Sequence, residues 1–343
     1  MKRMDWVCIL LAAVLVGTAA GETEYAWKVP VLDDGFGGLN TYLADYGVEL
    51  GLGATSIYQA NTRGGLSTNS RRGRWAGSYD LELNMDMDQL TGIEGASFYV
   101  HAEGGWPESE GIDAPSVGSF FGVNGDAMPR ESFVVTEAWW EQSLADGTLL
   151  IRLGKKDLTG GYEAEGAPVG FDGNAYANDE TSQFLNAALV NNPTIPFPDY
   201  ALGISAFWNP TPGWYAAAGA VDAQNDFRAT GFNTAFHDED YFFYVAETGI
   251  VPVLQGDKGE LPGAYRVGVW YDPRPKAHSD ATQLYRDDTG MYLSFDQLLM
   301  RENDASEDTQ GLGAFFRYGY AGGKRNDLAQ FWSAGFQYEG IFE

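Results

Sequence analysis

The segment SYDLELNMDMD, residues 78–88, decides the fold class. From Tyr79 to Met87 every second residue is apolar, and the residues between them carry acidic or amide side chains. Because successive side chains of a strand point to opposite faces, this strict period of two predicts a β-strand with one apolar and one acidic face. A face made almost entirely of carboxylates must contact water, either in a lumen or in bulk solvent.

The same alternation recurs along the chain, broken by Gly, Asn, Asp and Pro. Most of these segments carry an aromatic residue near one end, as the interfacial belts of membrane barrels require. The pattern predicts an all-β fold, a transmembrane antiparallel up-and-down β-barrel, and a soluble β-sandwich is the alternative. About twelve strands are expected, at residues 47–59, 75–90, 95–105, 132–143, 148–156, 199–208, 213–222, 240–251, 263–272, 289–298, 310–321 and 327–341.

The connections between these strands differ in length. Short ones at 91–94 and 145–147 suit periplasmic turns. The connection 157–199 contains Pro193, Pro196 and Pro198, and we expect it to be ordered. The long connections suit outer loops or loops folded into the pore, and they span residues 106–132, 157–199, 222–239 and 273–289.

The N-terminus has the composition of an export signal. Lys2 and Arg3 precede an apolar stretch at 7–16, and small residues follow up to Ala20. We expect a signal peptide at 1–20, an N-terminal periplasmic segment at 21–46 and a β-barrel domain at 47–343. Within the periplasmic segment, helical spacing of Leu39, Tyr42 and Leu43 predicts a short helix, with a loose turn as the alternative.

The bulk composition of the chain excludes several classes of protein. The net charge of −27 repels nucleic acid, so no nucleic-acid partner is expected. The 44 Gly residues and 14% aromatic content suit many short strands with tight turns. No stretch after the export signal is long and apolar enough for a transmembrane helix. The single cysteine, Cys8, lies in the predicted signal peptide, so the mature chain would have no thiol chemistry.

Catalytic motifs are weak. The three histidines, His101, His237 and His278, are accompanied by no Gly-x-Ser-x-Gly motif, and no carboxylate pair stands out. The acidic run at 237–240 lacks the spacing of an EF-hand. The sequence therefore predicts no enzyme, no catalytic residue, no cofactor and no metal. An outer-membrane barrel enzyme and a secreted sugar-binding β-sandwich are the alternatives.

Five segments in order carry a family resemblance. They are a Gly-Gly pair with a helix and first strand (Gly37–Leu50), an Asn-x-x-Gly-Gly block (Asn61–Gly65), an acidic strand with its turn (Tyr79–Gly95), a Gly-Lys block (Arg152–Asp157) and an Asn/Pro-rich loop (Phe184–Pro198). In these blocks the chain resembles the carbohydrate-selective porin family (OprB-like). The resemblance implies an outer-membrane location, passive diffusion of carbohydrates and outer-membrane lipid around the barrel. A homo-oligomer is left open.

The resemblance also implies a sixteen-stranded barrel, and the sequence falls short of that. The last residues, Gly340-Ile341-Phe342-Glu343, do not end on an aromatic residue, as barrel chains of this kind usually do. We therefore expect a C-terminally incomplete barrel. A genuine twelve-stranded barrel is the alternative, because even strand numbers are allowed.

The alternation also predicts which residues face the lumen. Arg and carboxylate groups match sugar hydroxyl pairs, and Trp covers the C–H face of a sugar ring; Trp139 is the predicted platform. One β-bulge would reverse the facing of all later residues in its strand. A general, non-selective porin is the alternative reading of the same charges. The predicted pore-lining residues are Arg72, Arg74, Asp80, Glu82, Glu137, Trp139, Arg152, Arg266 and Trp270.

Overall fold

The structure is a computed structural model that describes residues 38–69, 73–128, 131–159, 161–164, 167–226, 228–236, 240–277, 283–305 and 310–340. The predicted signal peptide and Arg72 lie outside these residues. Among the described residues, no helix has the length and apolar character needed to cross a membrane.

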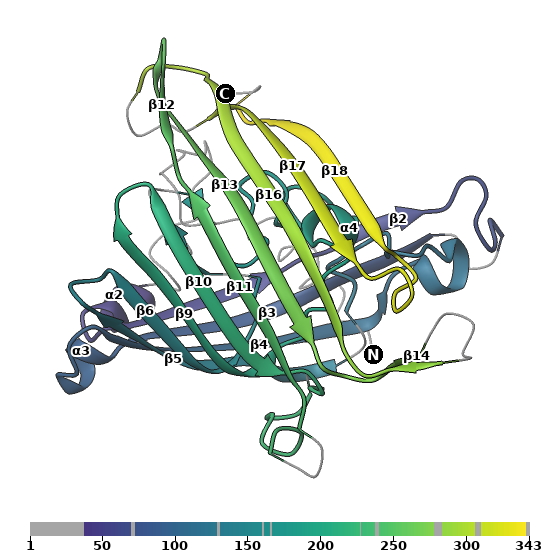
Figure 1. Cartoon of the computed structure of the whole chain (residues 1–343), viewed down its shortest axis with the longest axis horizontal. Coiled ribbons are helices and arrows are strands. Elements are labelled where there is room, and N and C mark those ends of the chain that lie inside the picture. The colour runs from purple at the N-terminus through teal and green to yellow at the C-terminus, as the bar shows by residue number, and fades with distance from the viewer. Residues whose placement is uncertain are drawn as a thin grey trace, which may run out of the picture.

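One antiparallel sheet of fourteen strands forms the wall (Figure 1). Two strands, β2 (Ile57–Ala60) and β12 (Val253–Gly256), lie off the main path and pair with β3 and β13, which leaves twelve strands in the path. Each strand of the path pairs with the next, so the predicted up-and-down topology is confirmed. The path is β1 (Val48–Ala54), β3 (Gly73–Asp86), β4 (Ala96–Glu110), β5 (Glu131–Leu144), β6 (Leu149–Lys156), β9 (Ala201–Thr211), β10 (Trp214–Asp222), β11 (Phe242–Ile250), β13 (Gly259–Asp272), β16 (Asp288–Arg301), β17 (Gly311–Ala321) and β18 (Gln330–Tyr338).

Short elements occupy the connections. The helix α2 (Leu39–Ala44) lies within the segment where a short helix was predicted, and that prediction is confirmed. Two two-stranded ribbons stand apart from the wall. The remaining short elements are α3 (Met87–Thr91), the π-helix η1 (Asp113–Val117), α4 (Ala187–Val190), β7 (Glu163–Ala164), β8 (Ala167–Pro168), β14 (Lys276–Ala277) and β15 (Leu284–Tyr285).

The prediction that the acidic strand continues to residue 90 is wrong. The strand β3 ends at Asp86, and α3 begins at the next residue. The Asp86 carboxylate accepts hydrogen bonds from the backbone N–H groups of Asp88 (2.9 Å) and Gln89 (3.2 Å). This side-chain cap satisfies donors that a new helix leaves unpaired, and Gly92 ends the helix in the left-handed conformation (φ 76°). Alternation therefore continued in the sequence past the point where the backbone changed.

The two faces of the wall differ as the alternation predicted. On β13, Val267 and Val269 are 41% and 55% exposed, whereas Arg266 and Trp270 are 1% and 2% exposed. The outer face is apolar and aromatic, as contact with lipid requires. Residues of this kind on the outer face include Leu153, Ile204, Trp208, Tyr244, Val267, Val269, Tyr271, Phe316, Trp332 and Phe336.

A β-bulge at Thr136 changes the facing along β5. His101 pairs with Glu137 and Ala102 pairs with Val135, so Thr136 is the extra residue. Because one residue is inserted, the odd-numbered residues point outward before the bulge and inward after it. Val135 is accordingly half exposed, and Thr136 itself is fully buried.

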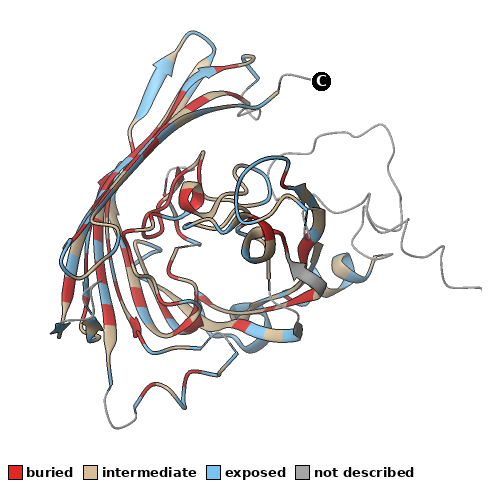
Figure 2. Cartoon of the chain, turned by 90° about the vertical axis from the view of Figure 1, so that its right-hand side faces the viewer, coloured by how far each residue is buried: buried red, intermediate tan, exposed pale blue. Residues whose placement is uncertain are grey.

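The inside of the curved sheet is occupied by the connection between β6 and β9, residues 157–200, here called the inner loop (Figure 2). Leu158, Phe171 and Ile195 of the inner loop join one buried cluster with wall residues such as Phe243 and Tyr292. The predicted ordered loop is therefore confirmed over its described residues. Its packing explains why many inward side chains of the wall are buried.

Candidate pore constriction

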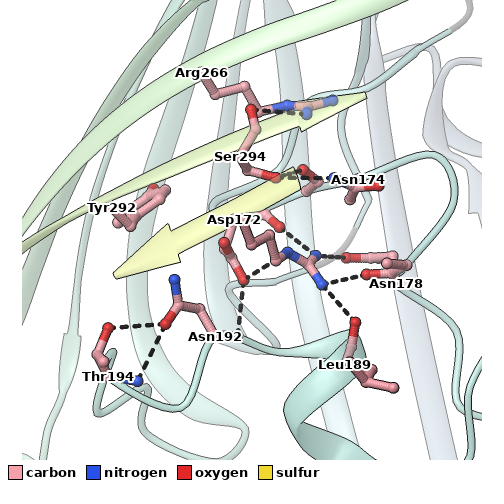
Figure 3. Close-up of polar contacts among 12 residues, drawn as sticks. Asp172, Asn174, Asn178, Leu189, Asn192, Thr194, Arg266, Tyr292 and Ser294 are labelled. Atoms are coloured by element: carbon pink, nitrogen blue, oxygen red, sulfur yellow. Dashed lines mark hydrogen bonds and ion pairs between the residues drawn. The ribbon is translucent and has the colours of Figure 1, made fainter. Parts of the chain in front are cut away.

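Arg317 of β17 holds the inner loop most extensively. Its guanidinium is fully buried and lies 3.3 Å (Nε–Oδ2) from the carboxylate of Asp172. It donates hydrogen bonds to the carbonyls of Asp172 (2.7 Å) and Leu189 (2.9 Å), to the carbonyl of Ala177 and to Asn178 Oδ1 (3.3 Å). Figure 3 shows Asp172, Asn178 and Leu189 converging on this contact. Burial raises the pKa of Asp172, and the neighbouring Arg317 opposes that rise.

Two further wall residues complete the attachment. Arg266 pairs with Asp296 (Nη1–Oδ2, 2.6 Å) and donates to the carbonyl of Pro168 in the inner loop. Glu247 of β11 accepts from the backbone N–H of Asp172 (3.0 Å) and from the hydroxyls of Tyr215 and Tyr292 (2.6 and 2.7 Å). Charged groups buried this deeply are stable only when their partners are in place. The wall from β10 to β17 is thus closed against the inner loop.

Arg152 forms a second attachment on the other side. Its guanidinium carbon lies 4.2 Å from the ring centroids of both Trp139 and Tyr162, and its Nε pairs with Glu141 at 2.7 Å. Tyr99, from the strand on the other side of β5, stacks on Trp139 at 4.9 Å. Tyr99 and Arg152 therefore both contact the Trp139 indole, and its role as a sugar platform stays a prediction.

A cavity of about 710 Å³ lies between the inner loop, the 119–128 connection and the inner face of β3 and β4. We call it the acidic cavity, because carboxylates from wall and loops line it together with aromatic rings. Its acidic and aromatic lining residues are Glu103, Asp126, Asp157, Glu180, Asp199, Phe120, Phe121, Phe197 and Tyr200.

Electrostatics in the loops around the acidic cavity favour protonation. Burial raises the pKa of Asp126 to about 7, although Ser78 donates a hydrogen bond to its carboxylate at 2.8 Å. Burial also raises the pKa values of Glu180 and Asp199. These groups crowd one water-accessible space, and each additional negative charge makes the next ionisation harder.

The structure separates the predicted pore-lining residues into two groups. Asp80, Glu82, Glu137, Trp139 and Arg152 lie on the inner face of β3, β5 and β6, and none of them is among the described residues that line the acidic cavity. Their pore-lining role stays a prediction.

The second group is placed differently. Arg266 and Trp270 also face inward, but the inner loop covers them. Arg74 lies near the start of β3 and donates to the carbonyl of Gly111 at 3.4 Å. Arg72 falls outside the described residues.

Sequence reasoning did not select Glu247, Asp126 or Asp199. A signal existed for Glu247, because it is the single carboxylate among the inward positions Phe243, Val245 and Gly249 of β11. A lone charge in an apolar inward row indicates a specific partner. Asp126 and Asp199 lie in connections, where alternation carries no information about direction.

An up-and-down antiparallel sheet with an apolar outer face, wrapped around an inserted loop and a charged cavity, defines the porin class of membrane channels. The chain belongs to the carbohydrate-selective porin, OprB family, whose family model matches residues 70–343. The predicted resemblance is confirmed by this match.

Solved structures show the same fold. The high-pH structure of Pseudomonas putida OprB matches with a TM-score of 0.71 and 17% identity, covering 90% of this chain and 74% of that chain. The low-pH structure of the same protein matches with a TM-score of 0.54 and 16% identity, over 93% and 80%. Among curated proteins, an uncharacterized protein of Aquifex aeolicus (strain VF5) is 37% identical over 75 residues, and the match spans 22% of this chain and 24% of that protein.

Proposed function

We propose that this chain forms a passive outer-membrane channel through which carbohydrates diffuse along the acidic cavity. The observation that carries the proposal is the composition of that cavity, about 710 Å³ in size, which carboxylates and aromatic rings line together. Carboxylates accept hydrogen bonds from pairs of sugar hydroxyls, and aromatic rings contact the apolar C–H faces of a sugar. A channel of this kind needs no catalytic group, and we propose no enzymatic activity.

The charge of the cavity supports a neutral solute. Among the described residues that line it, none is Lys or Arg. A purely acidic lining repels anions and attracts cations, and it places no charge barrier against a neutral molecule. Free sugars therefore suit this channel better than phosphorylated sugars.

We propose separate roles for the predicted site residues. Asp80, Glu82, Glu137, Trp139 and Arg152 line the solute path beside the acidic cavity, with Trp139 contributing its edge rather than a ring face. Arg266 and Trp270 support the inner loop that narrows the path. Arg72 and Arg74 belong to the approach to the pore.

The setting of the channel is part of the proposal. The exposed apolar outer face would contact outer-membrane lipid, and the barrel domain would comprise residues 47–343 after a periplasmic segment at 21–46. Export would remove residues 1–20 as a signal peptide. Assembly into a homo-oligomer is compatible with a family of membrane barrels.

Single-channel conductance in a planar lipid bilayer tests the function. We expect the purified protein to form ion-conducting channels whose current falls saturably as glucose or maltose is titrated. Steady conductance without any sugar effect would favour a general porin. A protein that is soluble without detergent and conducts no current would contradict the proposed channel.

A pair of matched variants tests the location of the path. Glu180→Gln removes one charge from the cavity, and we expect a several-fold change in the sugar concentration that halves the current. Asp257→Asn removes the same charge from the turn between β12 and β13, away from the cavity, and should leave the titration unchanged. Equal titrations for both variants would contradict the proposed path.

A further inference from the structure

Three ligand-type side chains meet on the inner face of β3 and β4. Asp80 and Glu103 lie directly opposite each other in the strand register, and His101 shares the face with Glu103 two residues away. His101 Nε2 lies 3.4 Å from Asp80 Oδ1. One nitrogen or oxygen atom from each of the three residues lies within 4.8 Å of the others. Two adjacent strands therefore bring one imidazole and two carboxylates to a single point.

The spacing of these atoms matches a metal coordination shell. Zinc bonds to His nitrogen at about 2.0–2.1 Å and to carboxylate oxygen at about 2.0–2.2 Å, so two ligands of a tetrahedral site stand about 3.4 Å apart. Nε2 of His101 and Oδ1 of Asp80 already have this separation. Bringing Glu103 to the same ion needs only a small side-chain adjustment, because its carboxylate is within the 4.8 Å group.

The charges of Asp80 and Glu103 also favour a bound cation. Like charges directly opposite each other on neighbouring strands destabilise a sheet, and Asp80 and Glu103 form such a pair. A divalent cation between them converts this repulsion into two attractions.

An outer shell of contacts holds the three ligands. Nδ1 of His101, the nitrogen turned away from Asp80, lies 3.2 Å from the hydroxyl of Thr136 and 3.9 Å from Glu137 Oε1. Metal-binding histidines commonly engage a polar partner through the second ring nitrogen, which fixes the ring. The bulge in β5 buries Thr136 at this position. Tyr200 donates to Glu103 at 3.1 Å. This support distinguishes the group from an acidic cluster on a surface.

We propose that His101, Asp80 and Glu103 bind one divalent transition-metal ion of the zinc type. His101 coordinates through Nε2 and each carboxylate through an oxygen. Glu103 also lines the acidic cavity, so the ion reaches the site from the solute path and keeps an open position toward it. The sequence alone does not indicate this metal site, because His101 and Glu103 form only a His-x-Glu pair and Asp80 belongs to another strand.

Isothermal titration calorimetry tests the site. The experiment uses EDTA-treated full-length porin in detergent micelles, titrated with zinc chloride. We expect one saturable site, and we expect His101→Gln to weaken it on the order of 100-fold, since an inner ligand matters at least as much as outer-shell partners. The control variant His237→Gln/His278→Gln removes the other two histidines of the chain and should bind zinc as the parent does. Absence of a saturable site, equal affinity in His101→Gln, or loss of binding in the control would overturn the proposal.

Cobalt absorption gives a second readout, and its main measurement uses the parent protein alone. Co²⁺ added to the parent protein should give the strong visible bands of a four-coordinate nitrogen–oxygen site, and one equivalent of Zn²⁺ should abolish them. Glu103→Gln should weaken these bands. A spectrum that stays that of aqueous Co²⁺ at every protein concentration would overturn the proposal.

Discussion

The inner faces of β3–β6 and of β10–β17 both carry charged residues at inward positions, but the two walls use them differently. Beneath the inner loop, Arg317 and Arg266 are 0% and 1% exposed, and each has an acidic partner and carbonyl partners. On the inner face of β3 and β5, the side chains of Asp80 and Glu141 keep 21% and 19% exposure. Inward charge thus has two roles in one sheet. It anchors a loop where water is excluded, and it stays partly exposed to water on the inner face of β3 and β5.

The largest expected effect is at the anchoring wall. Arg317→Met leaves the buried Asp172 without its ion-pair partner, and breaking a buried pair costs about 3–5 kcal/mol. We expect a corresponding loss of unfolding free energy in urea, together with a higher and noisier channel conductance as the inner loop loosens. Arg325→Met is the matched control, because Arg325 and Asp287 form an exposed pair worth about 1 kcal/mol or less. Similar losses of unfolding free energy for both variants would show that the buried Arg317 pair contributes no more than the exposed Arg325 pair.

The second largest expected effect is the loss of unfolding free energy when the Glu247 carboxylate is removed. Glu247→Leu removes the acceptor of two tyrosine hydroxyls and of the Asp172 N–H, and unsatisfied buried donors cost about 1–3 kcal/mol each. We expect a clear loss of unfolding free energy by urea titration, and Glu247→Gln should recover part of it. Glu260→Leu, on the exposed part of β13, serves as the control. A Glu247→Leu protein as stable as the parent would show that these hydrogen bonds do not anchor the loop.

The third effect is a pH dependence at the cavity wall. Because burial raises the pKa of Asp126 to about 7, its carboxylate loses charge as the pH falls through 7. We expect cation preference, measured as reversal potential in a KCl gradient, to decrease between pH 8 and pH 6. Asp126→Asn should show a smaller decrease in this range than the parent protein. A raised carboxyl pKa also means that Asp126 favours the folded state at acidic pH, and that this contribution is lost as the pH rises through 7.

The smallest effect separates stacking from charge at Arg152. Arg152→Lys keeps the charge but loses the planar group between Trp139 and Tyr162, where each cation–π contact contributes about 0.5–2 kcal/mol. We expect a modest loss of unfolding free energy in urea and a red shift of tryptophan emission. An unchanged emission spectrum would show that the guanidinium does not order the indole.

Local patterning made the wall predictable, and long-range contacts made the constriction unpredictable. A period of two runs from Tyr79 to Asp86 and through positions 265–271 of β13. This alternation predicts directly which of these side chains point inward and which point outward. The alternation runs on to Asp88, but the strand ends at Asp86 because its side chain caps a helix, and alternation does not predict such a cap. The bulge at Thr136 is invisible for the same reason. The partners of Arg317 lie in the inner loop, far away in the sequence. No pattern in the sequence around Arg317 predicts which residues they are.

The separation of these partners along the chain has a consequence for folding. Arg317 donates to the carbonyl of Asp172, a residue 145 positions earlier, and Asn174 donates to Ser294 from 120 positions earlier. Contacts that close such long loops form late, after local hairpins exist. The strands of the wall can therefore pair one after another while the inner loop is not yet attached to the wall. The narrow part of the channel is the last part to be assembled, so an intermediate that has β3–β13 but not β17 would already be a sheet without yet having a fixed constriction.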